Sequence, residues 1–196
     1  MARRSDHTRE ELRNLLIEEG HRLLAEQGLA RFSGREVAKR AGYTVGTIYN
    51  VFGSLDRLIG AINSYTFVLW ADFLRQRLED GGEDRIASLV EGYFDFALAY
   101  PNLWSAIYDH RLAEGESLDQ ADHDKRAALT AIVEAEVRAV LPDPDMPEAG
   151  RFAHSLIATV HGHCSYVVTG TFALLEETDP VGSALARVRE ALAAQG

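Results

Sequence analysis

Apolar side chains recur every three to four residues along most of this chain of 196 residues. That spacing lines one face of an α-helix, and no segment shows the strict alternation of a half-buried strand. Glycine and proline separate the periodic stretches, as at Gly81-Gly82, Pro101 and Asp179-Pro180. The sequence therefore predicts an all-α fold of about nine helices.

Capping residues mark where several of these helices begin and end. Thr8 and Glu11 fit the capping box, in which two side chains and two backbone N–H groups bond reciprocally, and Ser33 with Glu36 repeats it. Gly42 suits the C-terminal end of a helix. The predicted helices span residues 8–28, 33–42, 45–52, 58–78, 84–100, 102–112, 119–141, 148–176 and 181–194.

Charge is distributed unevenly along the chain. The net charge is −10, yet residues 1–57 hold ten Lys and Arg against eight Asp and Glu, whereas residues 58–196 hold ten against twenty-two. Screening confines attraction to phosphates to about 8 Å at physiological salt, so the local field matters more than the total. Residues 31–40 carry one acidic side chain, Glu36, among four cations: Arg31, Arg35, Lys39 and Arg40.

The cysteine content and the N-terminus indicate a compartment. One cysteine, Cys164, excludes an intramolecular disulfide and favours a reducing cytoplasm. The N-terminus lacks the apolar segment of an export signal, and Arg3 and Arg4 there form a basic arm or a solvated tail. Residues 155–175 are apolar but carry two histidines and hydroxyl groups such as those of Thr159, Ser165, Tyr166 and Thr169, which favours a buried or interface helix over a membrane span.

The segment 45–52 has two unlike faces on a helix that turns 100° per residue. Val45, Ile48 and Phe52 fall on one face, which we expect to be buried, and Thr44 precedes them as a cap. The opposite face is small and polar and comprises Gly46, Thr47 and Asn50, with Tyr49 on its flank. A polar helix face is often merely solvated, but a capped, basic preceding helix and a tight turn favour a helix-turn-helix that enters a DNA major groove.

The run from Phe32 to Phe52 resembles the DNA-binding signature of TetR/AcrR-type regulators. Their pattern leads from a Ser/Thr cap through Ile/Val-Ala-x-x-Ala/Leu-Gly to x-Gly-Thr-Ile/Leu-Tyr-x-x-Phe, and here it reads Ser33, then Val37-Ala38-Lys39-Arg40-Ala41-Gly42, then Val45-Gly46-Thr47-Ile48-Tyr49-Asn50-Val51-Phe52. The resemblance implies a homodimer that binds a double-stranded DNA operator, with an unidentified small-molecule effector in its C-terminal domain. Most such proteins repress transcription.

The resemblance also implies roles for single residues. Thr47 and Tyr49 match phosphate contacts, which fix register without reading sequence. Asn50 lies where a base reader is common, and Arg35 matches a position that reaches guanine in some relatives. Ser33 and Thr44 cap two helix N-termini, whose backbone N–H groups are expected to donate to phosphates. The predicted DNA-binding residues are Ser33, Arg35, Thr44, Val45, Gly46, Thr47, Tyr49 and Asn50.

One departure from that pattern concerns the start of the fourth helix. Relatives often carry lysine there, whereas this chain has Gly53 and Leu55. Each lost phosphate contact makes the salt dependence of DNA binding shallower by about one unit of log slope. We therefore expect DNA binding that depends less on charge than in those relatives.

Aromatic residues are dense between positions 58 and 112, where the resemblance implies an effector cavity. Plain core packing is the more common reason for such a stripe. An inducible regulator nevertheless needs an apolar cavity with a few polar anchors. The predicted ligand-binding residues are Tyr93, Trp104, Tyr108 and His110.

The last two predicted helices carry small and aliphatic residues suited to close helix packing, and we expect a dimer interface there. Val160-His161-Gly162 resembles the Trp-His-Gly element of one TetR subgroup. His154, His161 and Cys164 share about 80° of helix surface, but no second ligand cluster supports a metal site, so none is predicted. The predicted interface residues are Ala158, Gly162, Ser165, Val168, Leu185, Val188 and Leu192.

Together these features predict a DNA-binding domain over residues 1–57 and an effector-binding and dimerisation domain over residues 58–196. No cofactor and no enzymatic activity are expected, because the chain lacks a Gly-rich phosphate loop, a GxSxG elbow, an HExxH motif and paired cysteine clusters. An all-helical enzyme has no positive support. A helical interaction protein that no longer binds DNA stays an alternative, given Leu55 and the small positive balance of the N-terminal segment.

Overall fold

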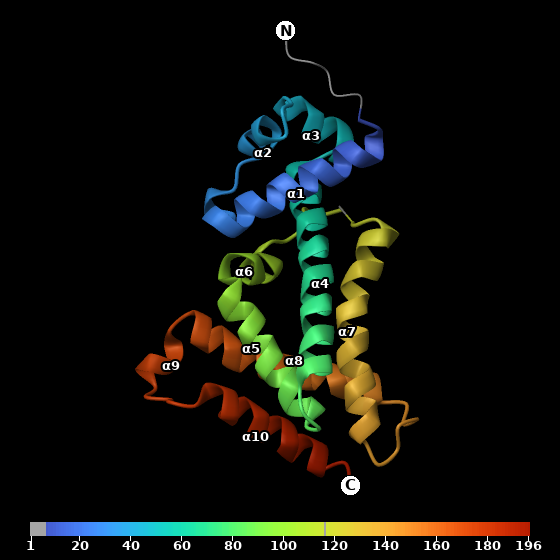
Figure 1. Cartoon of the computed structure of the whole chain (residues 1–196), viewed down its shortest axis with the longest axis vertical. Coiled ribbons are helices and arrows are strands. Elements are labelled where there is room, and N and C mark those ends of the chain that lie inside the picture. Colours follow the sequence, from blue (N-terminus) through green and yellow to red (C-terminus); the bar gives the residue numbers. More distant parts are fainter. Residues whose placement is uncertain (1–6, 116) are drawn as a thin grey trace. The chain divides into compact units, whose positions relative to one another are not determined.

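The computed structural model describes residues 7–115 and 117–196, so Arg3 and Arg4 lie outside the described part. These residues form helices without any strand, which confirms the all-α prediction (Figure 1). The elements are α1 (Arg9–Gln27), a 3-10 turn η1 (Leu29–Arg31), α2 (Gly34–Arg40), α3 (Val45–Phe52), α4 (Leu55–Asp80), α5 (Arg85–Ala99), α6 (Pro101–Asp109), α7 (Gln120–Val140), α8 (Ala149–Val168), α9 (Thr171–Leu174) and α10 (Pro180–Ala193).

Backbone proximity divides the chain into two compact units. Unit 1 comprises Met1–Thr66 and Asn102–Lys125, and unit 2 comprises Phe67–Pro101 and Arg126–Gly196. Helices α4 and α7 each begin in unit 1 and end in unit 2. The predicted boundary between residues 57 and 58 separates two functions and does not coincide with a boundary of these compact units. The assignment of functions to the two segments stays a prediction.

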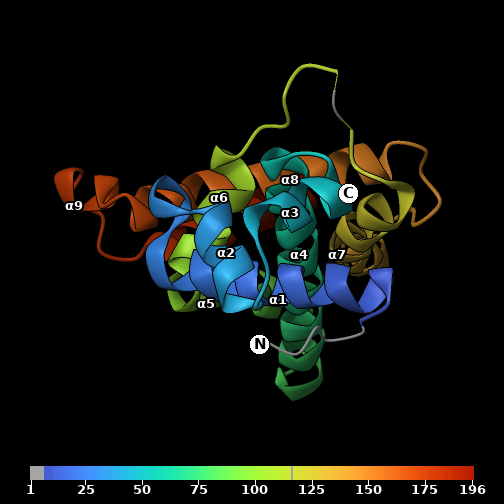
Figure 2. The ribbon, with the colours of Figure 1, turned by 90° about the horizontal axis from the view of Figure 1, so that it is seen from above.

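Helices α1, α2 and α3 lie together in unit 1 around one apolar core (Figure 2). The core explains the rotation of α3, because Ile48 and Phe52 are buried in it as predicted. The capping box at the start of α1 is present: Glu11 Oε2 accepts from the backbone N–H of Thr8 at 2.7 Å, and Thr8 Oγ1 accepts from that of Glu11 at 3.2 Å. The fully buried members of this core are Leu16, Leu23, Leu24, Val37, Ile48, Leu58, Ile62 and Ala106.

A tight turn joins α2 to α3. The backbone N–H of Tyr43 donates to the carbonyl of Ala38 at 2.8 Å, and that of Gly42 donates to Lys39 at 3.1 Å. This pair of bonds is the Schellman motif, which requires a left-handed residue at its second-last position. Gly42 occupies that position with φ of 80°, where a side chain would be strained.

Two local expectations differ from the structure. The predicted helix over 148–176 is two helices, because Gly170 adopts a left-handed conformation (φ 74°) that ends α8 before the single turn of α9. Thr44 occupies the N-cap position of α3, but its side chain makes no capping hydrogen bond. In contrast, Ser33 Oγ accepts a long one from the backbone N–H of Glu36 at 3.5 Å.

Unit 2 contains an aromatic cluster between α4 and α5. The Trp70 ring stacks on Phe96 with centroids 4.7 Å apart and an interplanar angle of 6°, and it meets Tyr93 edge-on at 4.8 Å. Helices α5, α8 and α10 pack on one another in the same unit. The buried rings of Trp70, Phe94 and Phe96 therefore serve the core, as the more common interpretation of such a pattern holds.

One histidine is held in the interior of unit 1. The His21 imidazole on α1 meets the ring of Tyr65 on α4 edge-on, with centroids 5.1 Å apart. Its Nε2 is buried and has no hydrogen-bond partner among the residues that the structure describes. Desolvation by burial, assisted by the charge of Arg22, lowers the pKa of His21 to about 4.

Because the pKa of His21 is lower in the folded than in the unfolded state, the unfolded chain binds the proton more readily. The contribution of His21 to the free energy of unfolding is therefore fully present above about pH 6.5 and falls as the pH approaches 4. After allowance for solvent screening, the loss is on the order of 2 kcal/mol. We expect His21→Phe to reduce the difference in unfolding free energy between pH 7 and pH 4.5, as measured by urea denaturation.

The matched control is His123→Phe, at an exposed position on α7. It should keep the pH dependence of the wild type. An identical pH dependence for His21→Phe and the wild type would contradict the assignment of the effect to His21.

Candidate DNA interface and effector cavity

The outward side of α3 carries the predicted DNA contacts. Tyr49 is 53% exposed, and Gly46 and Asn50 are exposed beside it, while Thr47 is half-buried. Val45, which the helical periodicity placed on the buried face, is 37% exposed because it begins the helix at the edge of the core. A small, polar, exposed helix face of this kind fits the major groove of B-DNA.

A surface hollow in unit 1 brings four of the predicted contacts together. Ser33 and Arg35 from α2 and its cap face Val45 and Tyr49 from α3 across it. The remaining four, which are Thr44, Gly46, Thr47 and Asn50, belong to α3 or its N-cap and do not line this hollow. The hollow is completed by Phe32, Gly34, Ile48 and Leu55.

The positive charge available on α2 is smaller than the sequence suggests. Both terminal nitrogens of Arg40 donate to the carboxylate of Glu26 on α1, at 2.8 and 3.0 Å, and its Nε lies 3.6 Å from Glu36. The hydrogen bonds that Arg40 donates to Glu26 raise the pKa of Arg40, so its charge is permanent but already compensated. By contrast, Arg35 is exposed and makes no hydrogen bond or ion pair with any residue that the structure describes. Arg35 is therefore the cation best placed for DNA.

Gly46 is not required by the packing of the protein itself. A Cβ atom built there would meet only Thr44 Oγ1, at 3.7 Å, which is ordinary contact. Glycine costs a helix about 0.5–1 kcal/mol relative to alanine. The packing of the described residues thus does not require glycine at this exposed position.

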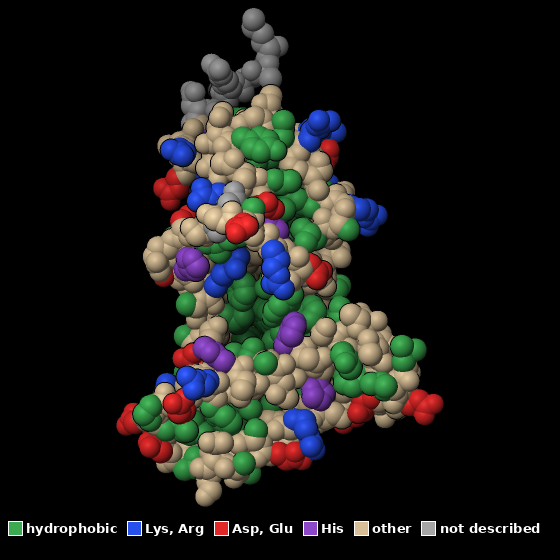
Figure 3. All heavy atoms as spheres, turned by 180° about the vertical axis from the view of Figure 1, so that it is seen from behind, with side chains coloured by type: hydrophobic (Ala, Val, Ile, Leu, Met, Phe, Trp, Pro, Cys, Tyr) green, Lys and Arg blue, Asp and Glu red, His purple; other side chains and the backbone are tan. Residues whose placement is uncertain are grey.

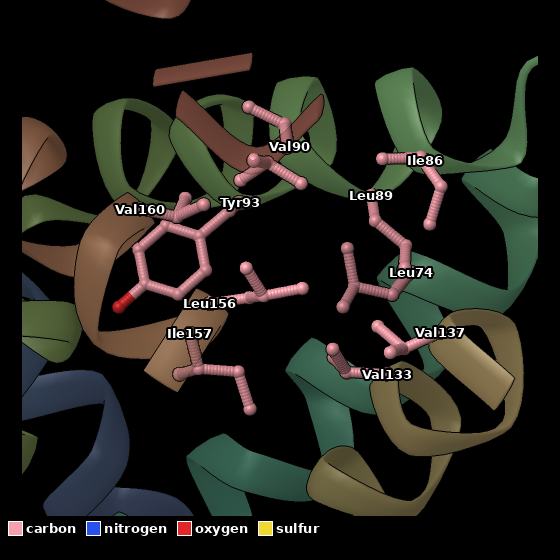
Figure 4. Close-up of a pocket in the computed structure, with 11 residues that line it drawn as sticks. Leu74, Ile86, Leu89, Val90, Tyr93, Val133, Val137, Leu156, Ile157 and Val160 are labelled. Carbon is pink, nitrogen blue, oxygen red and sulfur yellow. The ribbon is translucent and has the colours of Figure 1, made fainter. Parts of the chain in front are cut away.

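An apolar cavity lies within unit 2 (Figure 4). Of the predicted ligand residues, Tyr93 lines it, and its hydroxyl is 3.0 Å from Nδ1 of His161. The aliphatic residues were missed because a leucine or valine that faces a cavity carries the same helical pattern as one in the core. The lining consists of Leu74, Ile86, Leu89, Val90, Tyr93, Val133, Val137, Leu156, Ile157, Val160 and Val188.

The other three predicted ligand residues belong to unit 1. Trp104 is buried, with its ring 5.0 Å from that of Tyr108. His110 Nε2 lies 3.2 Å from a carboxylate oxygen of Asp56, in the first turn of α4. The structure therefore does not gather all four around the cavity of unit 2.

The predicted dimer residues differ in exposure. Ala158 and Gly162 on α8 are exposed, whereas Val188 on α10 is 3% exposed and lines the cavity, so it faces inward. The remaining four, which are Ser165, Val168, Leu185 and Leu192, are half-buried.

The residues beyond Gly170 follow the end of α8 and were not among the predicted site residues. Two of them are large and apolar and are open to solvent: Leu174 is 83% exposed and Leu175 is 62% exposed. Hydrophobic side chains gather on this end of the α8–α9 segment in the space-filling view (Figure 3).

The three α8 side chains considered as metal ligands have other surroundings. His154 Nε2 lies 3.0 Å from Glu134, His161 contacts Tyr93, and Cys164 is buried, which raises its pKa to about 12. Within residues 7–115 and 117–196, no group of three or more His, Cys, Asp or Glu is placed to hold a metal ion. Over the same ranges, no helix combines the length and the hydropathy of a membrane span.

Comparison with known proteins places this architecture in a class. Residues 16–62 match the model of bacterial regulatory proteins of the tetR family, and residues 86–189 match a tetracyclin repressor-like C-terminal domain. The second match spans more than half of the chain. Fold and site thus define a helix-turn-helix transcription regulator. The chain belongs to the tetR family.

Solved structures share the fold at low sequence identity. A protein of unknown function from Rhodococcus sp. RHA1 is 21% identical over 100% of both chains, with a TM-score of 0.72. The multidrug binding protein EbrR, solved with imidazole, is 21% identical over 95% of this chain and 96% of its own, with a TM-score of 0.64. A TetR transcription regulator from Haloarcula marismortui is 18% identical over 95% and 98%, with a TM-score of 0.62. No curated protein matches the chain.

The space around Gly46 leads to a prediction with opposite effects on two properties. Gly46→Ala should raise the unfolding free energy by about 0.5–1 kcal/mol, because alanine favours the helix and finds room. It should also weaken DNA binding, because the methyl group occupies the surface that faces the groove. Urea denaturation and fluorescence anisotropy with labelled DNA measure the two effects.

Gly150→Ala is the matched control, since Gly150 is likewise the second residue of its helix and an added Cβ would make only ordinary contacts. It should add a similar stability and leave DNA binding unchanged. Unchanged DNA affinity in Gly46→Ala would remove the assigned role of this glycine.

Proposed function

We propose that the chain acts in the cytoplasm as a homodimeric repressor that binds a palindromic operator and leaves it when a small molecule binds. The single observation that carries the proposal is the exposed polar face of α3, held by the buried Ile48 and Phe52. Membership of a family of transcription regulators supports the same function and offers no support for catalysis.

DNA recognition is assigned to the predicted contacts on α2 and α3. Tyr49 and Thr47 fix the register on phosphates, and Asn50 and Arg35 read bases. The exposure of Tyr49, Asn50 and Arg35 and the uncompensated charge of Arg35 support these roles. Functionally, residues 1–57 form the DNA-binding domain.

Residues 58–196 serve effector binding and dimerisation. The exposed small residues Ala158 and Gly162, together with the neighbouring Leu185 and Leu192, support an interface through α8 and α10. A symmetric dimer presents two equal recognition helices and so calls for a palindromic operator. The EbrR neighbour, a multidrug binding protein, supports a small-molecule effector.

The proposed switch is a population shift carried by α4. This helix supplies Leu58 to the core beneath α3 and Leu74 to the lining of the cavity in unit 2. A ligand that favours one position of α4 changes the separation of the two recognition helices. Its affinities for the two states must differ by at least one to three kcal/mol.

Within unit 1, α7 is also tied to the recognition helix. Arg13 on α1 donates to Asp122 at 2.8 Å and lies over the ring of Phe52 at 5.5 Å. The same helix, α7, supplies Val133 and Val137 to the lining of the cavity. Through the non-covalent contacts of Arg13, α7 offers a second route from ligand to α3, beside α4.

A gel-mobility experiment tests the function. The full chain is titrated onto DNA from the neighbourhood of its own gene at several salt concentrations. Tight binding to a palindrome, with a shallow salt dependence, is expected, and absence of binding at low salt would refute the proposal.

Three substitutions separate phosphate contacts from base readers. Tyr49→Ala should weaken binding about equally for every operator variant, because a phosphate contact carries no sequence information. Asn50→Ala and Arg35→Ala should each blunt discrimination at particular base pairs, by about 1–3 kcal/mol for a lost bidentate contact. Anisotropy titrations against a panel of single-base operator variants measure this, and equal losses for all three proteins across the panel would contradict the roles.

A further inference from the structure

The cavity of unit 2 has an unusually uniform lining. Side chains from five helices, α4, α5, α7, α8 and α10, reach it, and every one is aliphatic except Tyr93. A polar or charged group that enters such a site loses its hydration without gaining a partner. The lining therefore selects against charged ligands by desolvation.

The one polar side chain at the cavity is turned away from it. Figure 4 shows the Tyr93 ring at one end, with its hydroxyl oxygen directed away from Leu74 and Val137. That hydroxyl lies 3.0 Å from Nδ1 of His161. Burial lowers the pKa of His161, so the imidazole is neutral near pH 7 and supplies no charge.

Charged groups beside the lining residue Ile86 are already paired. Arg85 Nη2 donates to Glu136 at 2.6 Å, and Arg189 forms an ion pair with Asp84. Arg85 and Arg189 are therefore already engaged and do not offer a free charge to an anionic ligand. The carboxylates of Glu136 and Asp84 are likewise engaged and do not offer one to a cationic ligand. The balance of ten Lys and Arg against twenty-two Asp and Glu in residues 58–196 further disfavours anions.

The cavity is small and partly open. It offers about 40 Å³ to the centre of a water-sized sphere, and a single water needs about 10–15 Å³ by that measure. Apolar cavities lined by Leu, Ile and Phe bind molecules such as benzene. The room and the chemistry together fit one small ring or a short branched chain.

We propose that this cavity binds a compact, uncharged hydrocarbon of about one ring in size and that this chemistry defines the class of effector. The inference rests on the proposed ligand-responsive function but concerns ligand binding alone. It names three exclusions that can be measured: carboxylates, amines and bulky polycyclic compounds.

Calorimetry of the full chain without DNA tests the class with three probes that share a ring and differ in charge. Toluene should bind saturably, and benzoate and benzylammonium should each bind at least ten-fold more weakly, because the cavity offers them no counter-ion. Affinity for either charged probe within three-fold of toluene, or no saturable toluene binding, would overturn the proposal.

A pair of variants on α7 locates the site. Val133→Phe places a ring in the half-buried lining and should weaken toluene binding at least ten-fold. Val140→Phe makes the same change on the same helix at a position that is 49% exposed and outside the lining, and should stay within two-fold of the wild type. Ile157→Phe on α8 replaces Val133→Phe if circular dichroism shows that the latter is unfolded.

If the folded Val133→Phe or Ile157→Phe variant binds toluene as tightly as the wild type, the ligand binds elsewhere and the assignment to this cavity is refuted. DNA binding of the same preparations, measured without toluene, keeps the two proposals apart. If the wild type binds DNA but does not bind toluene saturably, only this inference is defeated, and if it binds toluene but not DNA, only the repressor function is defeated.

Discussion

The burial of Ile48 and Phe52 beneath α3 is the constraint on which the rest of the molecule depends. Burying an aliphatic or aromatic side chain of this size contributes about 1.5–3 kcal/mol, and turning α3 by half a revolution would expose both residues and bury Asn50 instead. An amide buried without a partner costs a further 1–3 kcal/mol. The apolar core therefore fixes which side chains α3 presents outward.

The same core limits how the protein can regulate itself. Leu58 of α4 is fully buried with Ile48, and Arg13 joins Asp122 of α7 to the ring of Phe52. A closely packed core does not deform gradually, so a displacement of either helix favours a new packing arrangement over a small distortion. In the proposed switch, α4 and α7 carry such a change, because each supplies residues to the cavity lining.

The sequence predicted best what depends on local chemistry. The capping box at Thr8, the glycine that ends α2 and the burial of Ile48 and Phe52 follow from short-range rules, although Thr44 makes no capping hydrogen bond, and the all-α class follows from periodicity. The break at Gly170 was missed because the apolar pattern continues across it, and a lone glycine within a helix is tolerated. The DNA-binding, ligand and interface residues stay predictions.

Features that need tertiary geometry were beyond the sequence. The pairing of Arg40 with Glu26 joins residues fourteen positions apart on two helices, and it removes one of the four cations that made the segment look strongly basic. Likewise, Val188 fits a helix-packing surface by its spacing but lines a cavity. The helical pattern of aliphatic residues indicates which of them are buried, but it does not distinguish a residue that packs on another side chain from one that lines a cavity.

Cleavage of DNA by a tethered iron chelate tests the central claim most directly. The chelate is attached at Thr44→Cys, whose side chain is exposed and makes no capping bond, while the buried Cys164 resists labelling. Thr178→Cys, exposed in unit 2, is the matched control. The account predicts two symmetric cleavage sites in the major groove, about 34–36 Å or a multiple of it apart, from Thr44→Cys alone. Scattered cleavage, or the same pattern from both positions, would contradict recognition through α3.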